Sequence, residues 1–459
     1  MFRKIQHIHL VGIGGSGMSG IAEVLLTLGY KVTGSDLAHS DITHRLAALG
    51  GQIFIGHREE HIAGAQVVVI SSAVQPTNPE VMAARQRVIP VIPRAEMLAE
   101  LMRLKFGVAI AGAHGKTTTT SMVASVLAQA GMDPTFVVGG KINALGTHAR
   151  LGRSDLLIAE ADESDGSFLR LSPSMVVVTN IDHEHLDHYG SMDCLQDAFL
   201  EFINKVPFYG IAILCADDEY LRALLPKVVK RYVTYGLVNQ YQTSSLDLSA
   251  SNIAIAGTVT EFQVQFQRKS LGTFRLGIPG AHNVSNALAT IAVALELDVP
   301  IDLIRNGLAA FQGVERRFHL RGEKQGIMVL DDYGHHPTEI HVTLKALKAG
   351  WTRRVIVCFQ PHRYTRTRDL LDKFIHVFDQ ADKVFITEVY AAGETPIPGI
   401  SGSMLAKTIQ ASGHPSVTYV ADKAHVVEQV LPQLQPDDMV ITLGAGDIWK
   451  VGVELLERL

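Results

Sequence analysis

The run GAHGKTTTT at residues 112–120 is the segment of this sequence best suited to bind a nucleotide. It follows the apolar segment 106–111, which predicts a buried strand, and it precedes a segment whose apolar spacing predicts a helix. A glycine turn at such a junction presents backbone N–H groups to phosphates, with Lys116 as a cation and Thr117 as a hydroxyl ligand for Mg²⁺. We expect ATP or GTP here, although Ile110 replaces the first glycine of the strict GxxxxGK[ST] pattern; an ordinary tight turn is the alternative.

A second glycine turn, GIGGSGMSG at 12–20, also follows a predicted strand and opens a predicted helix. Its glycines Gly12, Gly14 and Gly17 have the spacing of a dinucleotide fingerprint, and Asp36 lies about twenty residues further on. The pattern predicts a bound nucleotide diphosphate, because any pyrophosphate could lie at that helix N-terminus. It does not by itself predict a hydride-transfer cofactor, and a tight strand–helix turn remains the alternative.

Two loops rich in acids and histidines follow the next predicted strands of the middle region. EADESD at 160–165 places four acids in six residues, which would repel one another unless a cation lay among them. TNIDHEHLDHY at 179–189 adds three histidines and three acids, of which His185 and Asp187 could contact a second metal or a phosphate. A solvated acidic loop is the alternative for the first loop, and a zinc site for the second.

Polar groups of three other kinds could complete a nucleotide or substrate site. Asn283 and Asn286, three residues apart on a predicted helix, could read a purine edge, or Asn283 could cap the helix. His335 and His336 follow one predicted strand of the last region, and three arginines follow the next, where they could bind a carboxylate or the transferred phosphate. A solvent-facing basic loop is the alternative for the arginines, which are Arg363, Arg366 and Arg368.

The composition narrows the class of protein. With 459 residues the chain is too long for one core, and its net charge of −5, without a long basic run, argues against nucleic acid as the main partner. Its three cysteines are far apart and have no metal-ligand spacing. No apolar run has the roughly 20 residues needed to span a bilayer, and no signal peptide is evident, so the sequence predicts a cytoplasmic protein without a membrane partner.

Predicted strands and helices alternate along most of the chain, which is typical of parallel α/β domains. We predict three consecutive α/β domains: a Rossmann-like domain over 1–105, a P-loop ATPase-like domain over 106–314 with a small β-rich insertion, and a Rossmann-like domain over 315–459. The predicted strands outside the insertion are 5–11, 30–33, 66–71, 88–92, 106–111, 155–160, 175–180, 211–215, 327–330, 354–359, 383–387, 416–420 and 439–443.

Taken in order, seven stretches resemble those of the Mur ligase family, whose members add amino acids to peptidoglycan precursors at the expense of ATP. The stretches are GIGGSGMSGIAE, SSAV, AGAHGKTTTT, AEADESDGSF, GAHNVSNALA, VLDDYGHHPTE and FQPHRYTRTRDL. The resemblance covers essentially the whole chain. It implies that the carboxylate of UDP-N-acetylmuramate is activated as an acyl phosphate and joined to the amine of L-alanine, giving ADP and phosphate, in a monomer or weak homodimer that serves cell-wall synthesis and cell division.

The resemblance also implies a role for each matching residue. The first domain would bind the UDP sugar, the second ATP and the third the amino acid. Lys116 would act on the transferred phosphoryl group, and Thr117, Glu160 and His185 would ligate Mg²⁺. The implied ATP contacts are Gly112, Ala113, His114, Gly115, Lys116, Thr117, Thr118, Asn283, Asn286, Arg317 and Asp332. The residues implied near the amino acid are His335, His336, Arg363 and Arg366, and those near the UDP sugar are Gly14, Gly15, Gly17, Asp36, His57 and Ser72.

Two departures and three alternatives accompany the resemblance. Ala113 replaces the threonine usual in the phosphate loop, and no lysine lies between His185 and Lys205, so we predict no carbamoylated lysine. Either His335 or His336 could remove the amine proton.

Three alternative functions remain. The first is a ligase that attaches a murein tripeptide to the same nucleotide sugar. The second is a folylpolyglutamate-type synthetase, which would lack residues 1–105, and the third is a non-catalytic sensor that binds NAD.

Overall fold

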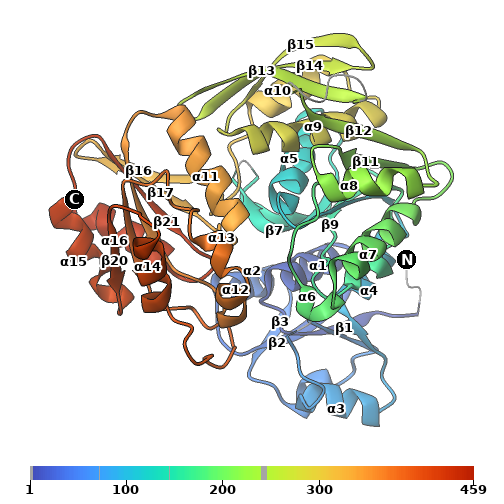
Figure 1. Ribbon diagram of the computed structural model, residues 1–459. Coiled ribbons are helices and arrows are strands. Elements are labelled where there is room, and N and C mark those ends of the chain that lie inside the picture. The colour runs from blue at the N-terminus through green and yellow to red at the C-terminus, as the bar shows by residue number, and fades with distance from the viewer. Residues whose placement is uncertain (1–3, 72, 144, 239–245) are drawn as a thin grey trace. The chain divides into compact units, whose positions relative to one another are not determined.

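The computed structural model describes residues 4–71, 73–143, 145–238 and 246–459. The chain divides into two compact units (Figure 1), each an α/β fold. No helix within the described ranges is long and apolar enough to cross a membrane. One unit comprises Met1–Ser251, Gln263–Phe274 and Ser285–Phe311, and the other comprises Asn252–Phe262, Arg275–Val284 and Gln312–Leu459. The domain boundaries at 105 and 314 remain predictions.

The N-terminal part of the first unit is a parallel sheet whose described strands follow the order β3-β2-β1-β4-β5. The central strand β1 is buried along its length, as the predicted apolar run requires. The sequence analysis missed β3, and the strand predicted over 88–92 begins only at Val91, because Val88 has a φ of 56°, outside the range of a strand. The elements are β1 (His7–Val11), α1 (Ser16–Thr27), β2 (Lys31–Asp36), α2 (Asp41–Ala48), β3 (Gln52–Ile55), η1 (Glu59–Ile62), β4 (Val67–Ile70), α3 (Pro79–Gln86), β5 (Val91–Pro93) and α4 (Arg94–Met102).

A larger sheet carries the predicted phosphate loop. Its described strands follow the order β15-β14-β13-β12-β11-β10-β6-β9-β7-β8, so β6 lies between β10 and β9 and runs parallel to both. The predicted β-rich segment continues this sheet through the pairing of β12 with β13. The elements are β6 (Phe106–Ala111), α5 (Lys116–Gln129), β7 (Thr135–Ile142), β8 (Thr147–Arg150), β9 (Leu156–Glu160), η2 (Ser167–Arg170), β10 (Met175–Val178), α6 (Leu186–Tyr189), α7 (Met192–Asn204), β11 (Ile211–Cys215), α8 (Glu219–Leu224), β12 (Tyr232–Leu237), β13 (Leu248–Ala256), β14 (Val259–Phe266), β15 (Lys269–Leu276), α9 (Ala281–Glu296) and α10 (Ile301–Ala309).

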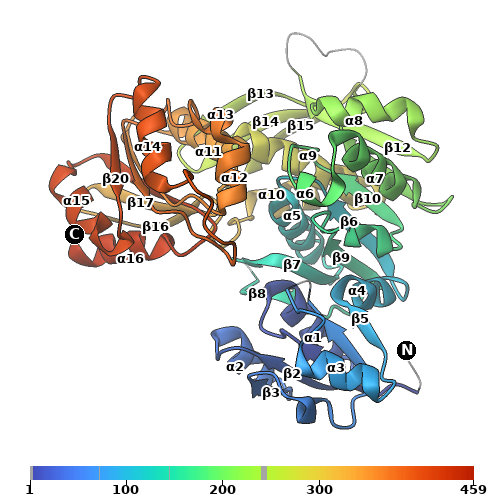
Figure 2. The ribbon, with the colours of Figure 1, turned by 60° about the horizontal axis from the view of Figure 1, so that its bottom comes forward.

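Helices of the N-terminal sheet pack directly on the larger sheet within the first unit. Helix α1 lies against β7 and β8 (Figure 2), and α4 lies against η2. The approach of α1 is close because it carries Gly20. A Cβ atom at this position would lie 3.0 Å from Val137 and 3.1 Å from Ala149. The packing therefore holds the first glycine turn in a fixed relation to the strands of the larger sheet.

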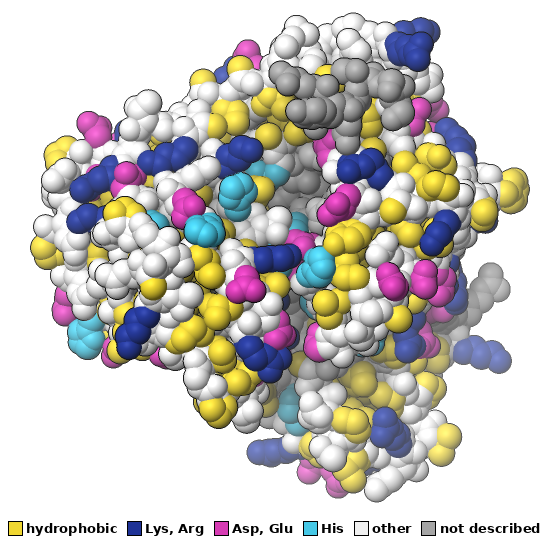
Figure 3. All heavy atoms as spheres, viewed as in Figure 1, with side chains coloured by type: hydrophobic (Ala, Val, Ile, Leu, Met, Phe, Trp, Pro, Cys, Tyr) yellow, Lys and Arg dark blue, Asp and Glu magenta, His cyan; other side chains and the backbone are white. Residues whose placement is uncertain are grey.

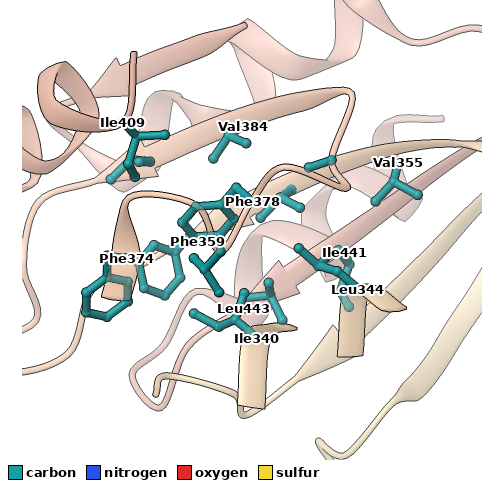
Figure 4. Packing of buried hydrophobic residues seen from close by; sticks show 14 of the residues in the cluster. Ile340, Leu344, Val355, Phe359, Phe374, Phe378, Val384, Ile409, Ile441 and Leu443 are labelled. Carbon is teal, nitrogen blue, oxygen red and sulfur yellow. The ribbon is translucent and has the colours of Figure 1, made fainter. Parts of the chain in front are cut away.

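The second unit contains a sheet whose strands follow the order β16-β17-β21-β18-β19-β20, with β16 antiparallel to β17 and the other pairs parallel. Its core includes Phe359, Phe374 and Phe378, whose rings face one another between strands and helices (Figure 4), with centroids 5.2 and 5.8 Å from that of Phe359. The elements are β16 (His319–Lys324), β17 (Ile327–Asp332), α11 (Pro337–Gly350), β18 (Arg354–Phe359), α12 (Tyr364–Asp369), α13 (Leu371–Phe374), β19 (Lys383–Thr387), α14 (Gly402–Ala411), β20 (Val417–Val420), α15 (Val426–Val430), β21 (Asp438–Leu443) and α16 (Trp449–Arg458).

The surface carries charges of both signs. On the face in Figure 3, Lys and Arg side chains are interspersed with Asp and Glu. This mixture follows from a sequence in which 41 basic residues nearly balance 46 acidic residues.

Candidate active site

The predicted phosphate loop lies between β6 and α5 and is shaped by two glycines. Gly112 has a φ of 126° and Gly115 a φ of 84°, both in the left-handed region that favours glycine. A Cβ atom on Gly112 would lie 2.2 Å from Thr179 Oγ1, and one on Gly115 would lie 2.7 Å from Asn286 Oδ1. The two glycines therefore give the loop its shape and let neighbouring segments approach it closely.

Lys116 is held inside its own loop. Its Nζ donates hydrogen bonds to the carbonyl oxygens of Gly112 at 2.6 Å and Ala113 at 3.3 Å, and to Oε1 of Glu163 at 2.7 Å. Burial by itself would lower the pKa of Lys116, but the carboxylates of Glu163 and Asp162 outweigh burial and raise it. Lys116 is thus a largely buried, charged residue of the predicted phosphate loop, paired with a carboxylate of the acidic loop.

The acidic and histidine-rich loops both lie beside the phosphate loop, because β9 and β10 pair with β6 from opposite sides. Parallel strands present their carboxyl ends at one edge of the sheet. From the histidine-rich loop, Asp182 Oδ2 lies 3.0 Å from His114 Nε2 in the phosphate loop. His185 Nε2 lies 3.8 Å from Glu163 Oε1 in the acidic loop. The structure therefore brings the three predicted motifs together.

The predicted magnesium ligands lie at the ends of three elements around this edge. Thr117 is in the first turn of α5, Glu160 ends β9, and His185 precedes α6 with a φ of 59°. Glu160 Oε1 accepts a hydrogen bond from the Gly139 N–H at 2.9 Å. Hydroxyl and carboxylate oxygens are the ligands that Mg²⁺ prefers. The oxygens of Thr117 and Glu160 suit this cation, whereas the imidazole of His185 is a nitrogen donor, and Mg²⁺ binding here remains a prediction.

Glu163 is the acidic residue set deepest in the site, with 1% of its surface exposed. Its Oε2 is buried and has no hydrogen-bond partner among the described residues, while its backbone oxygen accepts a hydrogen bond from the Tyr189 hydroxyl at 2.5 Å. The sequence analysis identified the acids at 160–165 as a group but did not single out Glu163. The density of acids was the available signal, and it does not tell which carboxylate turns inward.

The two predicted adenine contacts have different surroundings. Asn286 Oδ1 accepts a hydrogen bond from Thr119 Oγ1 at 3.1 Å and lies against the phosphate loop at Gly115. Asn283 Nδ2 donates to the Pro279 oxygen at 2.7 Å, which ties down the chain at the start of α9. This contact is local but is not an N-cap, because Asn283 lies within α9 and its side chain donates to a carbonyl, whereas an N-cap side chain accepts from a backbone N–H. Thr118, another predicted contact, is buried within α5.

The first glycine turn is hydrogen-bonded to the acid predicted to follow it. Oδ2 of Asp36 accepts a hydrogen bond from the Gly14 N–H at 2.8 Å. In dinucleotide-binding folds the acid at this position binds a ribose, whereas here the carboxylate faces the turn. Gly15 is the N-cap of α1 and has no side chain with which to cap it. Ser72, also predicted to contact the sugar, lies outside the described residues.

His57 belongs to a cluster around a buried carboxylate. Glu80 is fully buried, accepts a hydrogen bond from Ser35 Oγ at 2.5 Å, and lies 3.2 Å from His57 Nδ1 and 2.8 Å from His61 Nδ1. Burial raises the pKa of Glu80, but the nearby His9 ring and the hydrogen bonds from Ser35 and His61 outweigh burial and lower it to about 2. Glu80 therefore holds His57 in one position.

In the second unit, Asp332 and Arg317 lie at the carboxyl end of β17. Asp332 accepts hydrogen bonds from the N–H groups of Gly334 at 2.6 Å and Phe318 at 2.7 Å. Burial raises the pKa of Asp332 to about 6, against the opposing effect of Arg317. Arg317 Nη1 donates to Glu339 Oε1 at 3.1 Å. Asp332 thus fixes the backbone of the turn that carries the predicted histidines.

The two adjacent histidines are held differently. His336 is fully buried and caps α11, with its Nδ1 accepting a hydrogen bond from the Thr338 N–H at 3.3 Å. His335 Nδ1 lies 3.1 Å from the Tyr333 carbonyl oxygen. Because a carbonyl can only accept, Nδ1 of His335 carries the proton in this contact, and Nε2 has the lone pair. In His336, by contrast, Nδ1 has the lone pair and Nε2 carries the proton.

The predicted arginines lie at and after the end of β18, with Arg363 as the N-cap of α12 and Arg366 and Arg368 within that helix, near His362, which the sequence pattern did not indicate. Arg366 Nη1 lies 3.2 Å from His362 Nδ1, and the rings of His335 and His362 have centroids 5.4 Å apart. Burial lowers the pKa of His362 to about 3. Arg363 has a φ of 70°, and its N–H donates to the Tyr390 oxygen at 2.9 Å. His335, Arg366 and His362 are thus brought together at one sheet edge.

Three family models match consecutive parts of the chain: the Mur ligase family catalytic domain at residues 7–106, the Mur ligase middle domain at 110–294, and the Mur ligase glutamate ligase domain at 316–446. A UDP-N-acetylmuramate–L-alanine ligase of Geotalea uraniireducens is 57% identical over 459 residues, which are 100% of this chain and 99% of that protein.

Solved structures are similar over the same span. A UDP-N-acetylmuramate–alanine ligase from Thermotoga maritima matches with a TM-score of 0.83 and 29% identity over 98% of each chain. A murein peptide ligase from Psychrobacter arcticus matches with a TM-score of 0.71 and 25% identity, also over 98% of each chain. The predicted three-domain α/β class and the family resemblance are both confirmed. The chain belongs to the Mur ligase family.

Proposed function

We propose that this chain joins the carboxylate of UDP-N-acetylmuramate to the amine of L-alanine, with cleavage of ATP to ADP and phosphate, in peptidoglycan precursor synthesis. The observation that carries the proposal is Lys116, largely buried and paired with Glu163, in a phosphate loop flanked by the acidic and histidine-rich loops. A relative that is 57% identical over the whole chain bears the name of this activity, which supports the choice of substrates.

The reaction needs ATP because a carboxylate does not react with an amine directly, since its leaving group would be oxide. Transfer of the terminal phosphoryl group of ATP to a carboxylate oxygen gives an acyl phosphate and ADP. The amine then attacks the acyl carbon, and the tetrahedral intermediate collapses to the amide and phosphate. Lys116 offsets the negative charge of the transferred phosphoryl group. To do so, its ammonium group leaves Glu163 and contacts the phosphate instead.

Thr117, Glu160 and His185 would hold Mg²⁺ beside the phosphates. The buried Oε2 of Glu163, which has no hydrogen-bond partner among the described residues, is an observation that fits an additional cation at this edge. When bound, the metal would offset the negative charge of the phosphates.

The amine must lose a proton as it attacks, and of the two adjacent histidines we assign this role to His335. Its Nε2 has the lone pair that a base needs, because its Nδ1–H faces the Tyr333 oxygen. His336 uses its Nδ1 lone pair as the cap of α11, so its Nε2 carries the proton.

We expect His335→Gln to lower kcat by 10²–10⁴-fold at unchanged thermal stability. His336→Gln should chiefly lower the melting temperature, and equal loss of kcat in both variants at equal stability would refute the assignment.

An assay with UDP-N-acetylmuramate, ATP, Mg²⁺ and one amino acid at a time tests the proposed function. Phosphate release with L-alanine, accompanied by the amide product in mass spectrometry, is expected. Release with L-alanyl-γ-D-glutamyl-diaminopimelate and not with L-alanine would favour the tripeptide ligase, which the similarity to a murein peptide ligase keeps as the second candidate. Binding of NAD without ATP hydrolysis would contradict both.

A further inference from the structure

Arg94, the first residue of α4, lies directly over the first glycine turn. A Cβ atom on Gly17 would lie 2.1 Å from Arg94 Nη1 and 3.0 Å from its Cζ. No side chain other than hydrogen fits there while the guanidinium keeps its place. The third glycine of the fingerprint therefore makes room for a cation at the start of α1, and not only for the backbone of a ligand.

The same guanidinium reaches the acidic loop of the larger sheet. Arg94 Nη2 lies 3.3 Å from Asp162 Oδ2, with 26% of the Arg94 side chain exposed. Asp162 precedes Glu163, the partner of Lys116 in the phosphate loop. Arg94 thus lies between the first glycine turn and the acidic loop, with Nη1 beside Gly17 and Nη2 beside Asp162.

Packing fixes this arrangement. Helix α1 lies against β7 and β8 (Figure 2), and α4 lies against η2, which follows the acidic loop in the chain. The backbone segments that carry Gly17, Arg94 and Asp162 therefore cannot shift far relative to one another. A guanidinium presents a planar fork of N–H donors that matches phosphate oxygens, and in Arg94 only Nη2 has a described contact with Asp162.

We propose that Arg94 is a substrate-binding residue that contacts the diphosphate of the nucleotide sugar, and that Asp162 positions it. This inference rests on the proposed function for the identity of the ligand. It adds a charged contact to the backbone N–H groups of the turn, and it links the diphosphate to the acidic loop, whose Glu163 pairs with Lys116.

Calorimetric titration of the full-length protein with UDP tests the inference without ATP, L-alanine or turnover. Arg94→Gln should weaken UDP binding by about 10- to 100-fold, as expected for the loss of a charge-assisted hydrogen bond. Arg94→Lys should lose part of that affinity, because lysine keeps the charge but not the planar fork. Added salt should weaken binding by the wild type more than by Arg94→Gln.

Arg170→Gln is the matched control. Arg170 Nη1 lies 3.4 Å from Oε2 of Glu96, which is two residues beyond Arg94 on α4. This ion pair joins α4 to η2, so it resembles the pair of Arg94 and Asp162 but does not involve Arg94 or Gly17. It should leave UDP affinity unchanged. Equal weakening by Arg170→Gln and Arg94→Gln, or wild-type affinity in Arg94→Gln, would overturn the inference.

A double-mutant cycle tests the role of Asp162. Asp162→Asn should weaken UDP binding in the wild-type background and have no further effect in Arg94→Gln, because it acts through Arg94. Additive effects would overturn the positioning role.

A protein that binds UDP through Arg94 yet forms no amide would contradict the proposed function alone, whereas full amide synthesis and UDP affinity in Arg94→Gln would contradict only this inference.

Discussion

At the scale of the residue, the pair of Lys116 and Glu163 dominates the candidate site. Both side chains are largely buried, with exposed fractions of 18% and 2%, and their charged atoms lie 2.7 Å apart. Removing one partner of a buried ion pair leaves an uncompensated charge, which destabilises a protein more than the pair itself stabilises it. Glu163 thus supplies the negative charge beside Lys116 in the protein without nucleotide, and a phosphate of the nucleotide would take its place.

The first prediction is that Glu163→Gln destabilises the protein without nucleotide by about 2 kcal/mol, less than for a fully buried pair because Lys116 keeps some exposure. ATP brings a phosphate to Lys116, so it should raise the melting temperature more in this variant than in the wild type. Calorimetric melting with and without ATP measures both effects. Asp165→Asn, which changes an exposed acid of the same loop, is the control, and equal ATP shifts in the variant and the wild type would refute the prediction.

At the scale of the element, three strand ends create the site. Strands β9, β6 and β10 run parallel and adjacent, so the acidic, phosphate and histidine-rich loops meet at one edge. Gly112 allows this meeting, because its φ of 126° and its missing side chain let Thr179 approach. Gly131, at the other end of α5, has a φ of 79° but open space around it.

The second prediction compares these two glycines. Gly112→Ala should reduce ATP affinity by at least about 100-fold, because its Cβ would lie 2.2 Å from Thr179 Oγ1 and 2.9 Å from the Asn180 oxygen. Gly131→Ala should destabilise the protein by about 1 kcal/mol through backbone strain and leave ATP affinity intact. Equilibrium binding of ATP and urea unfolding separate the two effects. Wild-type ATP affinity in Gly112→Ala would show that the loop tolerates the displacement.

At the scale of the whole molecule, the two units respond differently to acid. In the second unit, burial lowers the pKa of His282 to about 4 and that of His362 to about 3. As the pH falls below 6.5, the unfolded chain binds protons that these native histidines do not, so stability is lost. Asp332, with a pKa of about 6, is protonated earlier in the native state and offsets part of this loss. In the first unit, Glu80 loses its contribution only as the pH falls from about 4.5 to about 2.

The third prediction is that the second unit loses roughly 2–3 kcal/mol of stability between pH 7 and pH 5, at 1.36 kcal/mol per pKa unit. Both tryptophans, Trp351 and Trp449, lie in this unit, so tryptophan fluorescence reports on it alone. The urea midpoint measured by fluorescence should fall between these pH values. His362→Gln should remove part of the fall, and a midpoint that does not change with pH would contradict the assignment of neutral buried histidines.

The sequence by itself determined the features that depend on neighbours along the chain. A strand, a glycine turn and a helix succeed one another at residues 7–27 and 106–129, and their patterns predicted both turns because the strand period, the turn glycines and the helix period are local properties. The order of seven motifs also predicted the family, and the full-length relatives confirmed it.

Only the tertiary structure decided which side chains meet. Nothing local distinguishes Glu163 from the other acids of its loop, yet its carboxylate lies 2.7 Å from Nζ of Lys116, which is 47 positions away. The approach of Arg94 to Gly17 and of His362 to His335 likewise depends on which strands pair and which helices pack. Such contacts follow from long-range burial and sheet register, which a local pattern of residues does not specify, and they determine how the predicted loops become a site.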